Sequence, residues 1–285
     1  SYMMDYLNKY GYTPDQEGIG RALEIIASNL ESVASEKVYK DCFSMMDLTT
    51  LKTNDTPASV EKLVGKVNSF RNSYPEWPLP ASVCVYPNFA STVKAARKCD
   101  FNITVVSACF PSSQSFLEVK LKECEMAVEQ GADEVDIVLA LNSFLAGDYE
   151  TAADEIRKVR ECIDAVAARQ DRKVHLKVIL ETGLLRTPEL IANASFLAME
   201  AGADFIKTST GKVDVNATPA AAYVMCECIA KYHAATGKKI GFKPAGGISS
   251  AADALCYYSI VASVLGKDWL NKEFFRFGVS RVANS

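Results

Sequence analysis

The sequence predicts an α/β protein that folds as a TIM (β/α)8 barrel with an N-terminal helical extension. Eight short apolar or β-rich runs alternate with helical segments, and 285 residues suffice for one such barrel. Glycines also cluster after the last three runs, where barrels commonly bind phosphate. The runner-up is a doubly wound open sheet, which favours a glycine-rich loop after the first strand, and Met46–Leu51 contains no glycine.

Two domains are predicted, an extension at residues 1–36 and the barrel at residues 37–285. Apolar residues recur at helical spacing in Ile19–Ala27, so we expect the extension to be helical and to pack on the barrel. The predicted strands are Val38–Met46, Ser82–Tyr86, Ile103–Phe110, Glu134–Ala140, His175–Glu181, Phe205–Thr210, Ile240–Pro244 and Phe275–Phe277. The predicted helices are Ala58–Phe70, Ser91–Lys98, Ser115–Gln130, Tyr149–Ala168, Pro188–Ala201, Pro219–Ala235 and Ser250–Leu265.

Helix boundaries are marked by capping residues. Thr187-Pro188 and Thr218-Pro219 each place a hydroxyl before a proline at the first helical position, and Gly202 and Gly237 fall just past helix ends. The sequence Gly-Ala-Asp also recurs before two strands, as in a repeated joint between helix and strand, at residues 131–133 and 202–204.

Composition excludes several classes of partner. The net charge of -4 and the lack of a basic stripe argue against nucleic acid, and no apolar run is long enough to span a membrane. The N-terminal residues resemble neither a secretory signal nor a transit peptide, so we expect a cytoplasmic protein. The nine cysteines show no Cys-x-x-Cys pair and there are two histidines, so we predict free thiols, no metal and no other cofactor.

Three charged residues interrupt strands that are otherwise apolar, namely Lys207, Lys243 and Asp136. Burying an ammonium group is costly unless it is paired or loses its proton. Lys207 and Lys243 lie on neighbouring predicted strands, so each disfavours the protonation of the other. A neutral lysine attacks a carbonyl to form a Schiff base, and Asp136 could move the protons directly or through a water. The alternative is a buried ion pair with a purely structural role.

Other polar residues are assigned supporting roles. Lys177 and Glu181 lie on one predicted strand and could form an ion pair. Asp47 could either bind a substrate hydroxyl or cap a turn. Phosphate could bind to the backbone of the glycines, which approaches anions closely, and to neighbouring side chains. The candidates for substrate and phosphate are Thr208, Gly211, Lys212, Gly246, Gly247, Ser249, Gly278, Ser280 and Arg281.

Several motifs together resemble the deoxyribose-phosphate aldolases. They include Met46–Leu51, Val83–Pro87, Leu176–Gly183, Gly202–Lys212 and Gly241–Gly247, in the expected order. The resemblance implies a class I aldolase that cleaves 2-deoxy-D-ribose 5-phosphate reversibly, without metal, to glyceraldehyde 3-phosphate and acetaldehyde. It also implies that Lys207 forms the Schiff base, that Lys243 lowers its pKa and that Asp136 relays protons.

The sequence departs from the family pattern at three positions. Ser249 and Asn142 each stand where the family usually has an arginine, and Arg281 stands where it often has a serine. We hypothesise that Arg281 restores the charge that Ser249 lacks. Two alternatives stay open, another phosphate-binding barrel that uses Lys207 as a base and a non-catalytic homologue that binds sugar phosphates. The predicted partners are the small phosphorylated sugar and aldehyde substrates, and a homo-oligomer is left open.

Overall fold

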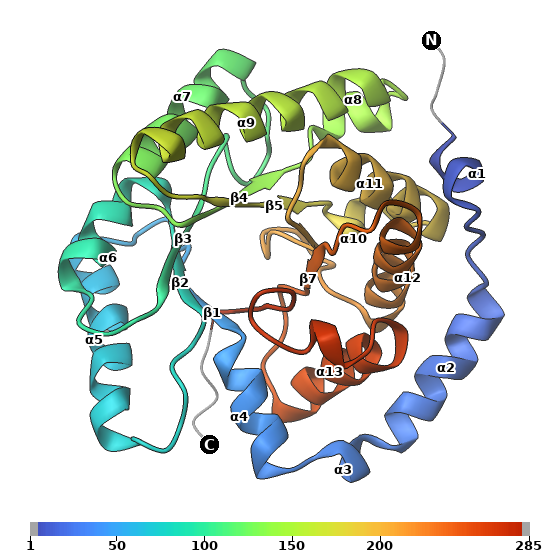
Figure 1. Cartoon of the computed structure of the whole chain (residues 1–285), viewed down its shortest axis with the longest axis horizontal. Coiled ribbons are helices and arrows are strands. Elements are labelled where there is room, and N and C mark those ends of the chain that lie inside the picture. The colour runs from blue at the N-terminus through green and yellow to red at the C-terminus, as the bar shows by residue number, and fades with distance from the viewer. Residues whose placement is uncertain (1–4, 281–285) are drawn as a thin grey trace.

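The computed structural model describes residues 5–280, and eight parallel strands form its centre. They lie in the order β7-β6-β5-β4-β3-β2-β1-β8, and two isolated bridges, Phe242–Phe275 and Ala245–Gly278, join the two ends of the sheet. Figure 1 shows this ring with helices around it. The predicted TIM barrel is therefore confirmed. The strands are β1 Met46–Thr49, β2 Ser82–Val85, β3 Asn102–Val106, β4 Glu134–Val138, β5 His175–Ile179, β6 Phe205–Lys207, β7 Gly241–Lys243 and β8 Phe277–Val279.

The outer layer consists of helices that follow the strands in turn. The long ones are α5 Pro57–Ser73, α6 Ala90–Ala96, α7 Leu117–Glu129, α9 Tyr149–Arg169, α11 Pro188–Ala201, α12 Pro219–Thr236 and α13 Ala251–Val264. Short turns that the sequence did not predict are η1 Pro87–Phe89, α8 Leu141–Leu145, α10 Thr182–Leu185 and η2 Lys267–Trp269. The side chains of Thr187 and Thr218 cap α11 and α12, as predicted.

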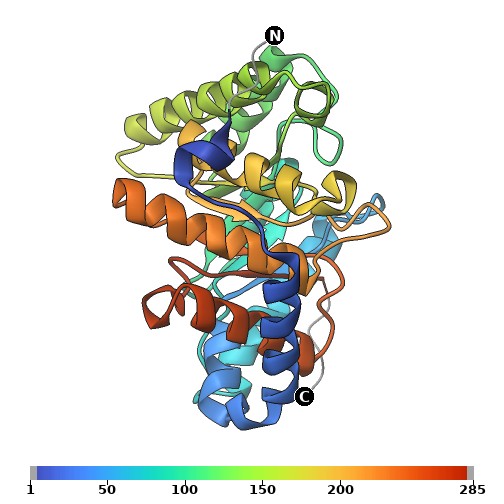
Figure 2. The same cartoon turned by 90° about the vertical axis from the view of Figure 1, so that its right-hand side faces the viewer.

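The N-terminal helices wrap around one side of the barrel. They are α1 Tyr6–Tyr10, α2 Gln16–Ser28, α3 Leu30–Val33 and α4 Glu36–Ser44, and they lie against α11, α12 and α13 (Figures 1 and 2). Tyr10 stacks on Phe196 with ring centroids 4.5 Å apart, and the Tyr12 hydroxyl donates to Glu227 at 2.9 Å. The predicted helical extension is confirmed, whereas the domain division at residue 37 stays a prediction.

The prediction of a strand at Val38–Met46 is wrong, because a helix, α4, occupies most of that range. The side chain of Ser35 caps this helix, and Lys37 pairs with Asp41 one turn later at 2.7 Å. The first strand begins only at Met46. The last strand is also displaced, since β8 covers residues 277–279 and not 275–277.

Several predicted strands end earlier than expected, because the chain turns sharply where the barrel opens. β3 ends at Val106, and Ala108 and Cys109 follow with φ values of 57° and 63°. β5 ends at Ile179, and Glu181 has a φ of 58°. These left-handed conformations cannot continue a strand.

The aspartates of the two Gly-Ala-Asp segments make equivalent contacts. Asp133 accepts a hydrogen bond from the backbone of Ile103 at 2.8 Å, and Asp204 accepts one from Leu176 at 2.8 Å. Each aspartate also pairs with an arginine, Arg172 or Arg160, at 3.0 and 2.6 Å respectively. The joints therefore fix the start of one strand against the next.

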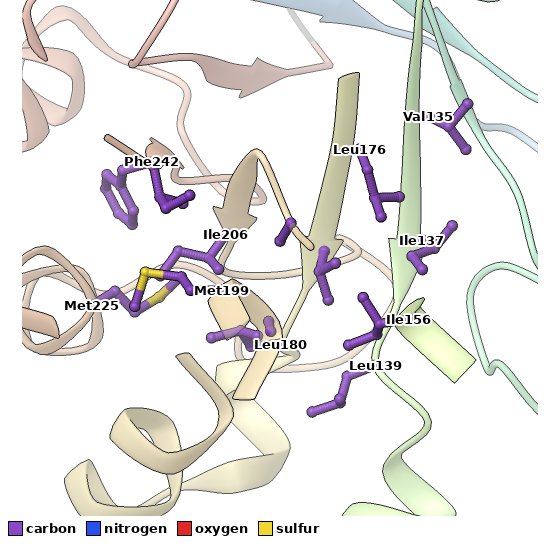
Figure 3. Packing of buried hydrophobic residues seen from close by; sticks show 14 of the residues in the cluster. Val135, Ile137, Leu139, Ile156, Leu176, Leu180, Met199, Ile206, Met225 and Phe242 are labelled. Atoms are coloured by element: carbon purple, nitrogen blue, oxygen red, sulfur yellow. The ribbon is translucent and has the colours of Figure 1, made fainter. Parts of the chain in front are cut away.

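The main core lies between the strands and the outer helices. Val135 and Ile137 of β4 point toward this layer, as do Leu176 of β5 and Ile206 of β6 (Figure 3). Because side chains alternate along a strand, the residues between them point into the barrel. This alternation directs charged residues of β4, β5 and β6 to the barrel interior. Within residues 5–280, no helix combines the length and apolar character that crossing a membrane requires.

Candidate active site

Lys207 and Lys243 end two neighbouring strands and lie side by side. They are register partners across β6 and β7, and their Nζ atoms lie 3.0 and 2.8 Å from the same oxygen, Oδ2 of Asp136. The Lys243 side chain is fully buried, whereas the Lys207 side chain retains 4% exposure. The three residues singled out in the sequence are therefore brought together, and Lys207 is the one of the three that retains some exposure.

Four more charged residues complete a buried cluster in the barrel interior. Asp47 Oδ2 lies 2.6 Å from Lys243 Nζ, and Lys177 Nζ lies 3.3 Å from both Asp47 and Asp136. Lys177 also pairs with Glu134. We call the seven residues the charged cluster: Asp47, Glu134, Asp136, Lys177, Lys207, Lys243 and Arg276.

Sequence reasoning missed two members of the charged cluster, Glu134 and Arg276. The guanidinium of Arg276 donates to Glu134 at 2.7 and 2.9 Å and to Asp47 at 2.9 Å. Its signal in the sequence was a charge between two aromatic residues, Phe275 and Phe277. Glu134 occupies the inward position that precedes Asp136 by two residues on β4.

The surroundings shift the pKa of the two catalytic candidates in opposite directions. Burial lowers the pKa of Lys207, and the adjacent ammonium of Lys243 lowers it further. Burial also disfavours charge on Lys243, but the carboxylates of Asp136 and Asp47 outweigh it and raise the pKa of Lys243 well above its usual range. Lys207 is thus the cluster ammonium that loses its proton most readily.

The carboxyl groups of the charged cluster stay ionised. Burial by itself raises their pKa, but Lys177, Lys243 and Lys207 together hold the pKa of Asp136 well below its usual value. Lys177, Lys243 and Arg276 do the same for Asp47. Arg276 and Lys177 lower the pKa of Glu134 to about 2.

The prediction that Lys177 and Glu181 form an ion pair is wrong. Lys177 points into the charged cluster, whereas Glu181 adopts a left-handed backbone conformation and accepts hydrogen bonds from the backbone and hydroxyl of Thr210, at 3.1 and 2.7 Å. Asp47 likewise neither caps a turn nor reaches the barrel mouth, because it is fully buried among Lys177, Lys243 and Arg276.

The candidate phosphate loops meet at the ends of β6, β7 and β8. Asn216 accepts a hydrogen bond from the Gly211 backbone at 3.0 Å, and its Cβ would lie 2.5 Å from a Cβ placed on Gly246. The N–H of Gly278 donates to Pro244 at 2.9 Å. The N–H groups of Gly246 and Gly247 have no partner among the described residues and are therefore free to meet an anion.

Other residues assigned to phosphate have varied surroundings. The hydroxyl of Thr208 exchanges hydrogen bonds with the backbone of Ala245, so it joins β6 to β7. The ammonium of Lys212 donates to the backbone of Leu51 across the barrel mouth. Ser249 and Ser280 are exposed, and Arg281 lies outside the described residues.

A small apolar cluster lies across the barrel from Lys207. Leu51, Cys84 and Val106 form a small cluster separate from the main core, with Tyr86 and Phe110 packed against it. Cys84 lies on β2, which is across the ring from β6.

The ionised carboxylates predict a specific loss of stability in acid. The folded pKa of Glu134, about 2, is below its unfolded value of 4.5, so the unfolded chain binds more protons between these pH values. Stability should therefore fall as pH decreases through that window, by about 3 kcal/mol from this group. Urea unfolding measured from pH 6 downward should show a steeper loss for the wild type than for Glu134→Gln. Parallel curves would contradict the pairing of Glu134.

Comparisons with known proteins identify a family of aldolases. The model of the DeoC/LacD family aldolases matches residues 42–257. A deoxyribose-phosphate aldolase of Homo sapiens is 42% identical over 250 residues, which cover 84% of this chain and 76% of that protein. The solved structure of QR15, an aldolase, has a TM-score of 0.65 at 26% identity and covers 84% of this chain and 91% of that one.

A tetrameric deoxyribose phosphate aldolase from Aeropyrum pernix shares the fold. Its TM-score is 0.64 at 21% identity, and the match covers 87% of this chain and 94% of that one. The family model spans most of the barrel, from the end of α4 into α13. The chain belongs to the DeoC/LacD family of aldolases.

Proposed function

We propose that the protein is a class I aldolase that reversibly cleaves 2-deoxy-D-ribose 5-phosphate to D-glyceraldehyde 3-phosphate and acetaldehyde. The observation that carries the proposal is the shared carboxylate oxygen, with Lys207 and Lys243 at 3.0 and 2.8 Å from Asp136 Oδ2. Membership of the aldolase family and a relative named deoxyribose-phosphate aldolase support the same reaction and substrate.

In the first step, the neutral amine of Lys207 attacks the aldehyde carbon of the open-chain sugar. The carbinolamine then loses water and becomes a protonated iminium. Lys243 stays charged and so favours the neutral form of Lys207 before the attack. Once the iminium forms, the carboxylate of Asp136 balances its positive charge at the same nitrogen.

In the second step, the bond between carbons 2 and 3 breaks. The 3-hydroxyl gives up its proton, carbon 3 becomes the aldehyde of the leaving triose phosphate, and the bonding electrons move to the iminium to form an enamine. Protonation of carbon 2 and hydrolysis then release acetaldehyde and regenerate Lys207. Asp136 is the proposed proton relay; since its low pKa makes it a weak base, it holds a proton only transiently.

Reductive trapping tests the proposal. Acetaldehyde and borohydride should leave an ethyl group on Lys207, located by peptide mass mapping, and turnover of 2-deoxy-D-ribose 5-phosphate should stop in step with the labelling. An adduct at another lysine would refute the assignment. Turnover without any adduct would favour a barrel that uses Lys207 as a base, and binding without turnover would favour a non-catalytic homologue.

The phosphate site is proposed to use the free N–H groups of Gly246 and Gly247 together with Lys212 and Arg281. Arg281→Ser should raise the KM for the phosphorylated sugar by about 10- to 100-fold, since a hydrogen bond to a charged group contributes about 1.5–3 kcal/mol. The KM for unphosphorylated 2-deoxyribose serves as the control and should not change. An equal change for both sugars would show that Arg281 does not bind phosphate.

Two further properties are proposed, a cellular location and an oligomeric state. A cytoplasmic location accords with nine cysteines that are all free. The homo-oligomer stays a prediction, which light scattering on the purified chain would check.

A further inference from the structure

Arg276 is the one arginine among the fully buried side chains of the described residues, and all three nitrogens of its guanidinium group donate hydrogen bonds. Its Nε donates to the backbone of Lys272 at 2.6 Å, while its two terminal nitrogens donate hydrogen bonds to Glu134 and Asp47. An arginine keeps its proton under all ordinary conditions. It therefore supplies a permanent positive charge at the floor of the site.

The charged cluster is electrically neutral only if one of its four basic groups is uncharged. It contains three carboxylates, Asp47, Glu134 and Asp136, and four basic groups, Lys177, Lys207, Lys243 and Arg276. A buried net charge is strongly unfavourable, so neutrality is the preferred state. With Arg276 permanently charged, one of the three lysines must give up its proton.

The number of carboxylate partners of each lysine determines which one is neutral. Lys177 pairs with all three carboxylates, and Lys243 pairs with both Asp47 and Asp136. Within residues 5–280, Lys207 pairs with Asp136 alone, through an oxygen that it shares with Lys243. Deprotonation therefore costs least at Lys207.

A chain of alternating charges connects Arg276 to Lys207. Arg276 occupies Oδ1 of Asp47 at 2.9 Å, and Oδ2 of Asp47 lies 2.6 Å from Lys243 and 3.3 Å from Lys177. Lys243 in turn pairs with Asp136, and Asp136 with Lys207. Losing the charge of Arg276 would leave the carboxylates in excess, and Lys207, the uncharged lysine of the charged cluster, could then take up a proton.

We propose that Arg276 is a positioning residue that keeps the Lys207 amine uncharged, by fixing Asp47 and Glu134 and by supplying the positive charge that Lys207 would otherwise carry. The inference rests on the proposed function, because it concerns the nucleophile of that reaction. Arg276 itself does not reach the reacting atoms; it acts through Asp47, Lys243 and Asp136.

Ionisable groups outside the charged cluster are left unchanged by the experiment. Cys84 on β2 acts electrostatically on Lys207, and Glu181 and Lys212 lie on the loops after β5 and β6. Because these groups are the same in every variant, differences between variants report the charged cluster.

The test measures how the rate of acetaldehyde adduct formation at Lys207 depends on pH, by reductive trapping and peptide mapping. Four proteins are compared: the wild type, Arg276→Met, Glu134→Gln and the double variant. Arg276→Met removes a positive charge, so the pH of half-maximal adduct formation should rise by at least about one unit. Glu134→Gln removes a negative charge and should lower it, and the double variant should lie near the wild type.

A structural role for Arg276 would lower the melting temperature without moving this midpoint. A midpoint for Arg276→Met equal to that of the wild type would therefore overturn the proposal; it would mean that a carboxyl group takes up the proton instead. Absence of any adduct in the wild type would overturn the proposed function itself, a separate outcome.

Arg276→Lys covers the case in which Arg276→Met does not fold. It keeps the charge but loses the two-pronged contact to Glu134, so its midpoint should stay within about half a unit of the wild type while its melting temperature falls. A midpoint that rises by a full unit in Arg276→Lys would contradict charge balance. A midpoint that does not fall in Glu134→Gln would contradict it equally.

Discussion

Replacing Lys207 by methionine is expected to abolish the acetaldehyde adduct and to lower kcat/KM by about five orders of magnitude, as for loss of a nucleophile in other covalent enzymes. The same variant should be nearly as stable as the wild type, within about 1 kcal/mol, because it exchanges an uncharged amine for an uncharged thioether of similar length. Loss of activity without loss of stability is the signature of an amine that is neutral at rest.

Urea unfolding at pH 7 and steady-state kinetics with 2-deoxy-D-ribose 5-phosphate would check this expectation. Lys120→Met is a useful comparison, since Lys120 is buried but pairs with Glu155 at 2.7 Å far from the charged cluster. It should lose stability and keep its adduct. A Lys207→Met protein that is destabilised as strongly as Lys120→Met would mean that Lys207 is charged in the folded state.

Replacing Lys243 by methionine should have a second and different effect. It removes an ammonium that pairs with Asp136 and Asp47 at 2.8 and 2.6 Å. Lys207 would then take up a proton in its place, and its pKa would rise toward the ordinary value of about 10.4. Because a smaller fraction of Lys207 is then neutral, activity at pH 7 should fall by about tenfold for each unit by which the pKa of Lys207 rises, and it should recover as pH is raised.

Stability adds an independent measure for Lys243→Met. Breaking a buried ion pair usually lowers the free energy of unfolding by about 3–5 kcal/mol, and protonation of Lys207 can offset part of that loss below pH 10. The variant should therefore be less stable than Lys207→Met at pH 7. A pH profile that keeps the wild-type midpoint would show that Lys243 does not set the protonation state of Lys207.

Much of the barrel could be predicted from the sequence because its signals are local. Thr187 and Thr218 precede prolines at helix starts, and the alternation of charged and apolar residues on β4 follows the period of a strand. Asp136, Lys207 and Lys243 were conspicuous for the same reason, as charges inside apolar runs.

Arg276 and Glu134 could not be recognised in this way, because their role depends on closure of the barrel. Arg276 pairs with residues that are 142 and 229 positions away in the sequence. It lies just before β8, at a position that the sequence analysis had placed inside a strand. Glu181 shows the opposite case: its left-handed backbone directs the carboxylate to Thr210 and away from Lys177, and periodicity alone cannot reveal that turn.

The neutral state of Lys207 is the central claim, and NMR of the lysine side chains tests it most directly. Labelled lysine would report the charge at each Nζ during a pH titration, and Lys207→Met would assign its resonance by absence. We predict that Lys207 loses its proton at a lower pH than Lys177 and Lys243, because burial and the Lys243 ammonium lower the pKa of Lys207 while the carboxylates raise the pKa of the other two. Titration of Lys207 near pH 10.4, or a neutral Lys243 beside a charged Lys207, would contradict the account.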